Sequence, residues 1–258
     1  MPPPPALPAW LADPARAADW LERLAGRLTV HRRHRIETVL DRRTRYLTVA
    51  LEDIYQPHNA AAVLRSCDGF GVQDVHILEN RNPFETKSQK SNVSMGTERW
   101  LTLHRYKEIR DPAKADTPEL NHPATQRGLE NLKAQGYRLA ALTLRGSPRE
   151  LSDVPLDKPL ALLVGTELTG LSDAAHALAD YQVRLPMEGF AQSFNLSVCT
   201  AVCLYELTRR LRDPKNALSW PLSPAERQQL FFEWIHRDVQ GADELLARWE
   251  AEARSVHD

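Results

Sequence analysis

The chain has 258 residues, of which 42% are hydrophobic and 26% are charged, and its formal net charge is −1. This length favours one sizeable core with additions at its ends over two small domains, and the near-neutral charge gives no overall sign of nucleic-acid binding. No apolar stretch is long enough to span a bilayer and residues 1–10 lack the pattern of a signal peptide, so we expect a soluble, cytoplasmic protein without a membrane partner.

Two helices are predicted in the first 45 residues. A proline-rich leader at residues 2–8 is expected to be extended or disordered. Apolar residues such as Trp20 and Leu24 recur at helical spacing, which predicts a short amphipathic helix over residues 14–26. A second helix is expected over residues 29–43.

This second helix carries most of a basic cluster between residues 27 and 45, and another basic cluster follows the last helix of the core. One such cluster is as consistent with a solvated helix as with an RNA-binding surface. Two clusters that flank a single core favour RNA, because arginine side chains neutralise phosphates. The predicted RNA contacts are Arg32, Arg33, Arg35, Arg42, Arg43, Arg209 and Arg210.

From residue 46 the pattern becomes that of an α/β protein. Strands are predicted at residues 46–51, 75–78, 138–142, 160–164 and 181–185, with helices over 59–68, 127–135 and 172–179. Strands that are apolar throughout and alternate with helices predict a parallel sheet with helices on both faces. Two polar loops, 82–96 and 106–125, interrupt this pattern, and the first is long enough to suggest a function.

The C-terminal part is predicted to be helical. One helix begins near Ser193 and continues to Arg212, and amphipathic helices over 223–239 and 242–253 follow it. The tryptophans of these last helices are expected to pack rather than to bind a ligand. The predicted segments are a leader with a short helix (1–26), a basic helix (27–45), the core (46–212) and a helical extension (213–258).

Several common functional motifs are absent from the sequence. The stretch from Gly69 to Gly71 lacks the third glycine of a dinucleotide-binding loop and follows a helix, so we interpret it as a helix C-cap. No phosphate-binding lysine loop or serine-hydrolase elbow occurs. Cys199 and Cys203 lie one helical turn apart, which is typical of small core residues. The three cysteines have no pairing pattern, which indicates a reducing compartment, and we predict no metal.

Polar residues cluster at three places next to predicted strand ends. Asn59 and Arg65 share one helix, and Glu167 follows a buried strand and a glycine. Ser193 and Asn195 stand at the start of a helix, after a turn of the kind that can hold a nucleotide-like cofactor. Each cluster alone has an ordinary structural interpretation: a helix cap for Asn59 and for the Ser193 segment, and a surface salt bridge for Arg65.

Together these clusters resemble the three ordered motifs of the SpoU/TrmH class of S-adenosylmethionine-dependent RNA ribose 2′-O-methyltransferases. The motifs are Asn59-x-x-Ala62-x-x-Arg65, Leu163-Val164-Gly165-x-Glu167-x-x-Gly170-Leu171 and Leu185-Pro186-Met187-x-Gly189-x-x-Gln192-Ser193-x-Asn195-Leu196-Ser197. The similarity covers residues 32–212 and is greatest to the tRNA-modifying branch of the class. Leu168 stands where many members have lysine, and Phe190 and Phe194 are bulkier than usual.

The resemblance implies a fold, an assembly and a reaction. The fold is a SPOUT-type parallel sheet with helices on both faces and a deep C-terminal trefoil knot formed by the second and third motif loops. General topology rules argue against knots, so the resemblance alone supports this one. The implied enzyme is a homodimer that methylates a ribose 2′-hydroxyl of tRNA, with the D-loop guanosine as the expected target.

The resemblance also implies site residues. Those expected to bind S-adenosylmethionine are Leu163, Gly165, Leu185, Met187, Ser193 and Leu196. Ser193 and Asn195 are expected near the reacting groups, with Glu167 and Asn59 in support. Arg65 is the residue the family treats as catalytic, and because arginine stays protonated we favour a role in stabilising the 2′-oxyanion over one as a base.

Two alternatives stay open at this point. The chain could be an rRNA methyltransferase of the same family, although those relatives often carry a separate RNA-binding domain ahead of the core. It could also be a non-catalytic RNA-binding protein on the same fold. Against that alternative stands the joint presence of five residues: Asn59, Arg65, Glu167, Ser193 and Asn195.

Overall fold

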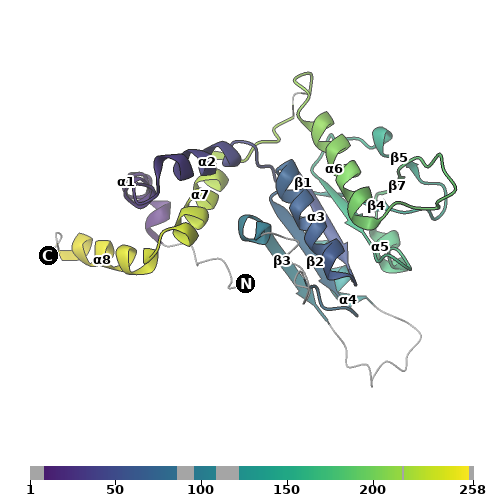
Figure 1. Ribbon diagram of the computed structural model, residues 1–258, viewed down its shortest axis with the longest axis horizontal. Helices are drawn as coiled ribbons and strands as arrows, with labels where there is room; N and C mark the ends of the chain where they lie inside the picture. The colour runs from purple at the N-terminus through teal and green to yellow at the C-terminus, as the bar shows by residue number, and fades with distance from the viewer. Residues whose placement is uncertain (1–8, 86–95, 109–121, 217, 256–258) are drawn as a thin grey trace. The chain divides into compact units, whose positions relative to one another are not determined.

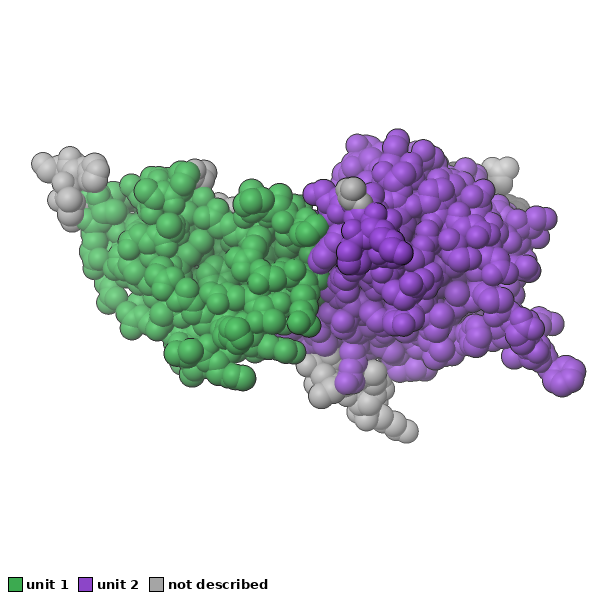
Figure 2. Space-filling model, turned by 90° about the horizontal axis from the view of Figure 1, so that it is seen from above, with its two compact units in different colours: residues 1–43, 221–258 green, residues 44–220 purple. Residues whose placement is uncertain are grey.

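The computed structural model describes residues 9–85, 96–108, 122–216 and 218–255. The predicted proline-rich leader and most of the two predicted polar loops lie outside these residues. The chain divides into two compact units, residues 44–220 and residues 1–43 with 221–258, which Figure 2 colours purple and green. Among the described helices, none has both the length and the hydropathy needed to cross a lipid bilayer.

The larger unit contains a seven-stranded sheet in the order β3-β2-β1-β6-β4-β7-β5, and all its neighbouring strands are parallel. The strands are β1 Leu47–Glu52, β2 Asp74–Glu79, β3 Thr102–Lys107, β4 Arg138–Leu142, β5 Arg149–Glu150, β6 Leu160–Val164 and β7 Tyr181–Arg184. The predicted α/β class with a parallel sheet is therefore confirmed. The strand order does not test the knot, which stays a prediction.

Helices cover both faces of this sheet (Figure 1). They are α3 Pro57–Phe70, α4 Pro123–Ala134, α5 Asp173–Leu178 and α6 Leu196–Leu211. Within β1, Val49 belongs to the core beneath α3 and α6, and the next residue, Ala50, belongs to the core beneath α4 and α5. Successive strand residues point to opposite faces, so the apolar strands of the sequence follow from burial on both sides.

The bounds of α3 follow from local chemistry. The helix begins at Pro57, two residues before the predicted start, because a proline at the first helical position forgoes an N–H that would have no partner there. It ends at Phe70, and the C-cap residue Gly71 adopts the left-handed conformation with φ +77°. The C-cap prediction for this glycine is confirmed.

The smaller unit is helical, and its helices come from both ends of the chain. They are α1 Pro14–Ala25, α2 Val30–Leu40, α7 Pro224–Asp238 and α8 Ala242–Ser255, after a short 3-10 turn at Ala9–Ala12. Buried aromatic rings join them: Trp10 lies 5.1 Å from Trp20 and 5.4 Å from Phe232 between ring centroids. Trp234 and Trp249 are buried as predicted. The structure thus groups most of the three segments predicted outside the core into one unit. Helices from both ends of the chain share its aromatic core.

Candidate active site

Strand β6 leads into a tight turn at the C-terminal edge of the sheet. Thr166 and Gly170 pair through two backbone hydrogen bonds of 3.0 and 3.1 Å, which fold residues 166–170 back on themselves. A Cβ atom on Gly165 would lie 2.2 Å from the carbonyl carbon of Gly170, a contact that no side chain could make. Gly170 has φ +70°, which favours glycine. The two glycines of the second motif therefore shape the turn that carries Glu167.

A chain of hydrogen bonds joins the three motifs, and it starts at the N-terminus of α6. Asn195 caps this helix, and its Oδ1 accepts from the backbone N–H groups of Ser197 at 3.0 Å and Val198 at 3.4 Å. Because Oδ1 accepts, the Nδ2 group of Asn195 donates, and it does so to Oδ1 of Asn59 at 3.2 Å. Asn59 in turn donates from Nδ2 to Oε1 of Glu167 at 2.7 Å. The helix cap thereby sets the direction of every bond in the chain.

The structure corrects two predictions about the helix starts in these motifs. Asn59 does not cap α3, because Gln56 occupies the N-cap position and Asn59 is buried within the first turn. The predicted start of α6 near Ser193 is too early, because the helix begins at Leu196. Ser193 is exposed in the preceding loop.

A cavity of about 540 Å³ opens beside this hydrogen-bond chain, and we call it the first cavity. Five of the six residues predicted to bind the cofactor line it: Gly165, Leu185, Met187, Ser193 and Leu196. The sixth, Leu163, is buried in the core beneath α4 and α5 and does not line the cavity. Glu167 and Asn195 also contribute to its wall. The second and third motifs thus meet at one hollow.

The residues of the first cavity fit S-adenosylmethionine. Its volume lies within the range of small-molecule sites. Leu142, Val164 and Leu196 offer apolar surface for an adenine ring, and the backbone of two turns offers hydrogen-bond partners for its edge. Glu167, exposed at the wall, supplies a carboxylate that would complement a positively charged ligand.

Arg65 lies apart from these residues. It is exposed on α3 and lines no part of the first cavity. Asn59 and Arg65 are six positions apart on the helix, a separation of about one and two-thirds turns and about 9 Å, so the two side chains leave the helix in different directions. No hydrogen bond or ion pair within the described parts of the chain engages the Arg65 side chain. A single copy therefore brings Asn59, Glu167 and Asn195 together but not Arg65.

One feature of α6 was missed by sequence reasoning. The helix buries Cys203, Leu204 and Leu207 against the sheet, yet Val202 and Tyr205 are 43% and 58% exposed. The sequence signal was available, because apolar residues occur all round this helix rather than on one stripe. A helix that is apolar on its solvent side has a surface suited to burial against a partner.

The predicted RNA-binding residues of the N-terminal helix differ in their surroundings. Arg35 and Arg42 are exposed. Arg33 is held by Glu22 at 2.6 Å and by Glu37 at 2.9 Å, and both carboxylates raise its pKa. Arg32 pairs with a carboxylate of α7.

The prediction that Arg43 contacts RNA is wrong. Its side chain is 1% exposed and its guanidinium lies 5.1 Å from the ring centroid of Trp234. The residue is therefore part of the helical core, which a charge pattern alone could not distinguish from a surface position.

The two predicted contacts at the end of α6 also have partners within the chain. Arg209 pairs with Glu206 at 3.0 Å. Arg210 donates to the backbone carbonyls of Leu151 at 3.0 Å and Val154 at 2.6 Å. Arg209 stays exposed, whereas Arg210 is half-buried and anchors α6 to residues 151–154, between β5 and β6.

The two cysteines of α6 have different surroundings. Cys203 is buried, as expected of a small core residue, whereas Cys199 lines the first cavity. A hydrogen bond between them lowers the pKa of Cys199 and, together with burial, raises the pKa of Cys203. In the described ranges, no three potential metal-ligating residues lie close enough to hold an ion.

Comparisons with known proteins agree with the three-motif arrangement. Residues 46–205 match a family model described as the SpoU rRNA methylase family. The chain is 34% identical over 213 residues to the tRNA (guanosine(18)-2′-O)-methyltransferase of Borreliella burgdorferi, covering 83% of this chain and 88% of that protein. It is 35% identical over 210 residues to the protein of the same name from Thermus thermophilus, covering 81% and 98%.

Solved structures show the same similarity. The TrmH/SpoU tRNA modifying enzyme of A. aeolicus matches with a TM-score of 0.63 and 28% identity, over 83% of this chain and all of that one. The SpoU methyltransferase AviRb of Streptomyces viridochromogenes, solved in complex with AdoMet, matches with a TM-score of 0.51 and 26% identity, over 67% of this chain and 63% of that one.

Proposed function

The chain belongs to the SpoU rRNA methylase family, and from this premise we propose that it transfers the methyl group of S-adenosylmethionine to a ribose 2′-hydroxyl of tRNA. The proposed target is the D-loop guanosine, and the names of its relatives give guanosine 18 as the methylated position. The observation that carries the proposal is the hydrogen-bond chain from Asn195 through Asn59 to Glu167 beside the first cavity. A tRNA substrate is consistent with the predicted cytoplasmic location.

The tRNA substrate is favoured over rRNA by the extent of the similarity. The B. burgdorferi tRNA enzyme aligns over 83% of this chain. A 23S rRNA (guanosine-2′-O-)-methyltransferase of Burkholderia sp. aligns over 69% of this chain and 66% of its own length, at 31% identity. The tRNA relatives thus match more of this chain, including segments outside the core.

The chemistry requires alignment and charge stabilisation. S-adenosylmethionine supplies a methyl group that is already activated, so the protein has to orient the ribose hydroxyl and stabilise the negative charge that develops on its oxygen. Glu167 and Asn195, held in place by Asn59, border the first cavity and would position the reacting groups. Arg65 would stabilise the developing oxyanion.

Because Arg65 lies away from the hydrogen-bond chain, the proposal includes a homodimer in which a second copy supplies it. Val202 and Tyr205 expose apolar surface on α6, which packs beside α3 in the same unit. Burying this surface against a second copy would favour association. A complete site would then combine Arg65 of one chain with Asn59, Glu167 and Asn195 of the other.

The proposed RNA-binding surface of the helical unit is narrower than the sequence predicted. His31, His34 and Arg35 are exposed on α2 and share one side of it through their i, i+3 and i+4 spacing. With Arg42 they form the part of the basic cluster proposed to contact phosphates.

In the test, the purified protein is incubated with labelled methyl donor and either total tRNA or total rRNA. The modified nucleoside is then mapped by mass spectrometry. We expect the label in tRNA as 2′-O-methylguanosine. Label in rRNA alone would favour the other branch of the family. Binding of tRNA without S-adenosylmethionine affinity in calorimetry would favour the non-catalytic RNA-binding alternative.

A further inference from the structure

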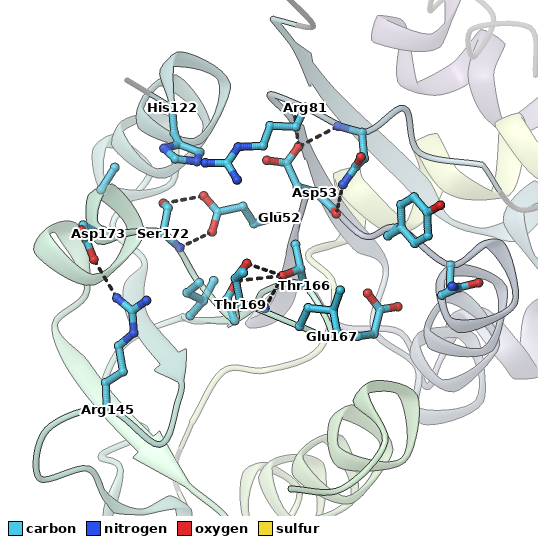
Figure 3. A pocket seen from close by; sticks show the side chains of 17 residues that line it. Glu52, Asp53, Arg81, His122, Arg145, Thr166, Glu167, Thr169, Ser172 and Asp173 are labelled. Carbon is cyan, nitrogen blue, oxygen red and sulfur yellow. Dashed lines mark hydrogen bonds and ion pairs between the residues drawn. The ribbon is translucent and has the colours of Figure 1, made fainter. Parts of the chain in front are cut away.

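A second cavity, of about 870 Å³, shares a wall with the first. The turn at residues 166–171 and the side chain of Arg145 line both cavities. The second cavity lies over the C-terminal end of β1, between this turn and the segments that contain Arg81 and His122 (Figure 3). A ligand whose reacting group faces the first cavity could therefore continue into the second across this wall.

The floor of the second cavity is polar and fixed. Glu52 is 2% exposed and accepts hydrogen bonds from the hydroxyls of Thr125 and Ser172, each at 2.6 Å, and from the backbone N–H of Ser172 at 2.8 Å. Asp53 is 4% exposed and accepts from the backbone N–H groups of Asn80 at 2.7 Å and Arg81 at 2.8 Å. These carboxylates already have partners, so the floor is a rigid support for the groups around the rim.

The rim carries groups of a different kind. Arg81 and Arg145 are cationic and both line the hollow (Figure 3). Tyr55 also lines it and adds an aromatic ring that is 65% exposed. Arg145 is paired with Asp173 at 2.6 Å. The Arg81 side chain has no hydrogen bond or ion pair among the residues described by the structure.

A cavity of this composition matches one class of ligand. Cations at the rim favour a phosphate, the exposed ring favours a stacked base, and the exposed carboxylate of Glu167 favours a group that also carries hydrogen-bond donors. A lone anion would satisfy only the first of these. A nucleotide of single-stranded RNA offers all three.

We propose that the second cavity binds the nucleotide next to the methylated one in the RNA chain, with Arg81 at its phosphate and Tyr55 against its base. This inference rests on the proposed function, since it requires the target ribose at the first cavity. It gives the turn at residues 166–171 two roles, because one side faces the cofactor and the other faces the RNA strand.

The test measures tRNA affinity in the presence of S-adenosylhomocysteine over a range of salt concentrations. Arg81→Gln is expected to weaken binding about fivefold or more and to reduce the slope of log affinity against log salt by about 1, as expected for one lost phosphate contact. Arg81→Lys keeps the charge and is expected to retain the wild-type slope. Tyr55→Ala is expected to weaken binding about fivefold or more through lost stacking, whereas Tyr55→Phe keeps the ring and the affinity.

Two controls separate this proposal from the one on which it rests. Lys158→Gln removes a positive charge from an exposed position before β6, outside both cavities, and should leave tRNA affinity unchanged. S-adenosylmethionine affinity, measured by calorimetry, should match the wild type in all variants.

If the wild-type protein methylates tRNA but Arg81→Gln and Tyr55→Ala bind it normally, the subsite assignment alone is wrong. If the variants lose cofactor affinity as well, the substitutions act through the shared wall and the assignment also fails. If the wild-type protein neither binds nor methylates tRNA, both proposals fail.

Discussion

At the scale of single residues, the site depends on the two glycines of its turn and on three hydrogen-bonded side chains. Those side chains are Asn59, Glu167 and Asn195. Gly165 must lack a side chain because the turn folds back onto it, and Asn195 must accept from a helix terminus before it can direct Asn59. Uncharged residues such as Gly165 and Asn195 are therefore as necessary as Glu167 to the geometry of the site.

Gly165→Ala is expected to abolish S-adenosylmethionine binding or to destabilise the protein by several kcal/mol, because the new Cβ would meet backbone at 2.2 Å. Gly69→Ala is the matched control. Gly69 lies in α3 with nothing within 4 Å of an added Cβ, so this change should leave stability equal or raise it by about 0.5–1 kcal/mol. Chemical denaturation and calorimetry would measure both effects. Normal cofactor binding in Gly165→Ala would contradict the described turn.

Arg65→Ala is expected to lower kcat on the order of a hundredfold or more, because it removes a group proposed to stabilise the oxyanion. Cofactor affinity should be unchanged, since Arg65 does not line the first cavity. Arg149→Ala, which removes an exposed arginine from β5, serves as the control in the same steady-state assay. A loss of less than about tenfold would count against the catalytic role of Arg65.

The sequence was sufficient to identify the motif residues of the site, but it did not predict where each of their side chains lies. The resemblance of the three motifs to those of the family implied that Glu167 and Asn195 would share a site, and the structure joins them through Asn59. The six-residue spacing of Asn59 and Arg65 on one helix already places their side chains on different sides of α3, but the motif resemblance grouped both residues in one site. The sequence also could not show that Arg43 is buried, since burial depends on the distant helix α7.

At the scale of the elements, the strands that sequence reasoning missed lie at the two edges of the sheet. β3 is partly exposed and carries three basic residues, and β5 has only two residues, so neither forms the apolar run that predicts a buried strand. The central strands were predictable because both of their faces are covered.

The β2–β3 edge contains a pair of stacked histidines that should affect stability. His76 is 2% exposed and stacks on His104 with 4.5 Å between centroids. Burial first, and the neighbouring His104 second, lower the pKa of His76 to about 4 from its ordinary 6.5, against a smaller opposing effect of Asp74. The folded state therefore resists a protonation that the unfolded state accepts.

Between pH 6.5 and 4 the unfolded chain binds the additional proton, so the free energy of unfolding should fall as the pH falls through this window. The contribution of His76 between pH 7 and pH 5 is about 2 kcal/mol. His76→Gln removes the titration, so urea denaturation should show a smaller loss of stability for this variant than for the wild type over the same pH change. Equal losses in the two proteins would contradict the burial of a neutral histidine.

At the scale of the whole molecule, the proposed homodimer supplies two copies of the chain for each complete site. It can be tested by mixing two inactive variants, Arg65→Ala and Asn195→Ala, under conditions that allow subunits to exchange. In a mixed dimer one site would lose both groups and the other would retain both. Random mixing should therefore restore about a quarter of wild-type activity.

The control mixes Asn59→Ala with Asn195→Ala, whose side chains are hydrogen-bonded within one chain. Every site in that mixture lacks one of the two groups, so no activity should return. If the Arg65→Ala and Asn195→Ala mixture also stays inactive, although sedimentation shows mixed dimers, then Arg65 does not act across an interface.

The claim that the chain methylates a ribose oxygen is tested most directly by a tRNA with one atom removed. A tRNA assembled with 2′-deoxyguanosine at the position that relatives methylate, guanosine 18, keeps its base but offers no hydroxyl to the methyl donor. We predict that unmodified tRNA accepts one labelled methyl group at this nucleotide and that the deoxy substrate binds but accepts none. Methyl transfer to the deoxy substrate at the same rate would place the modification on another atom and contradict the account.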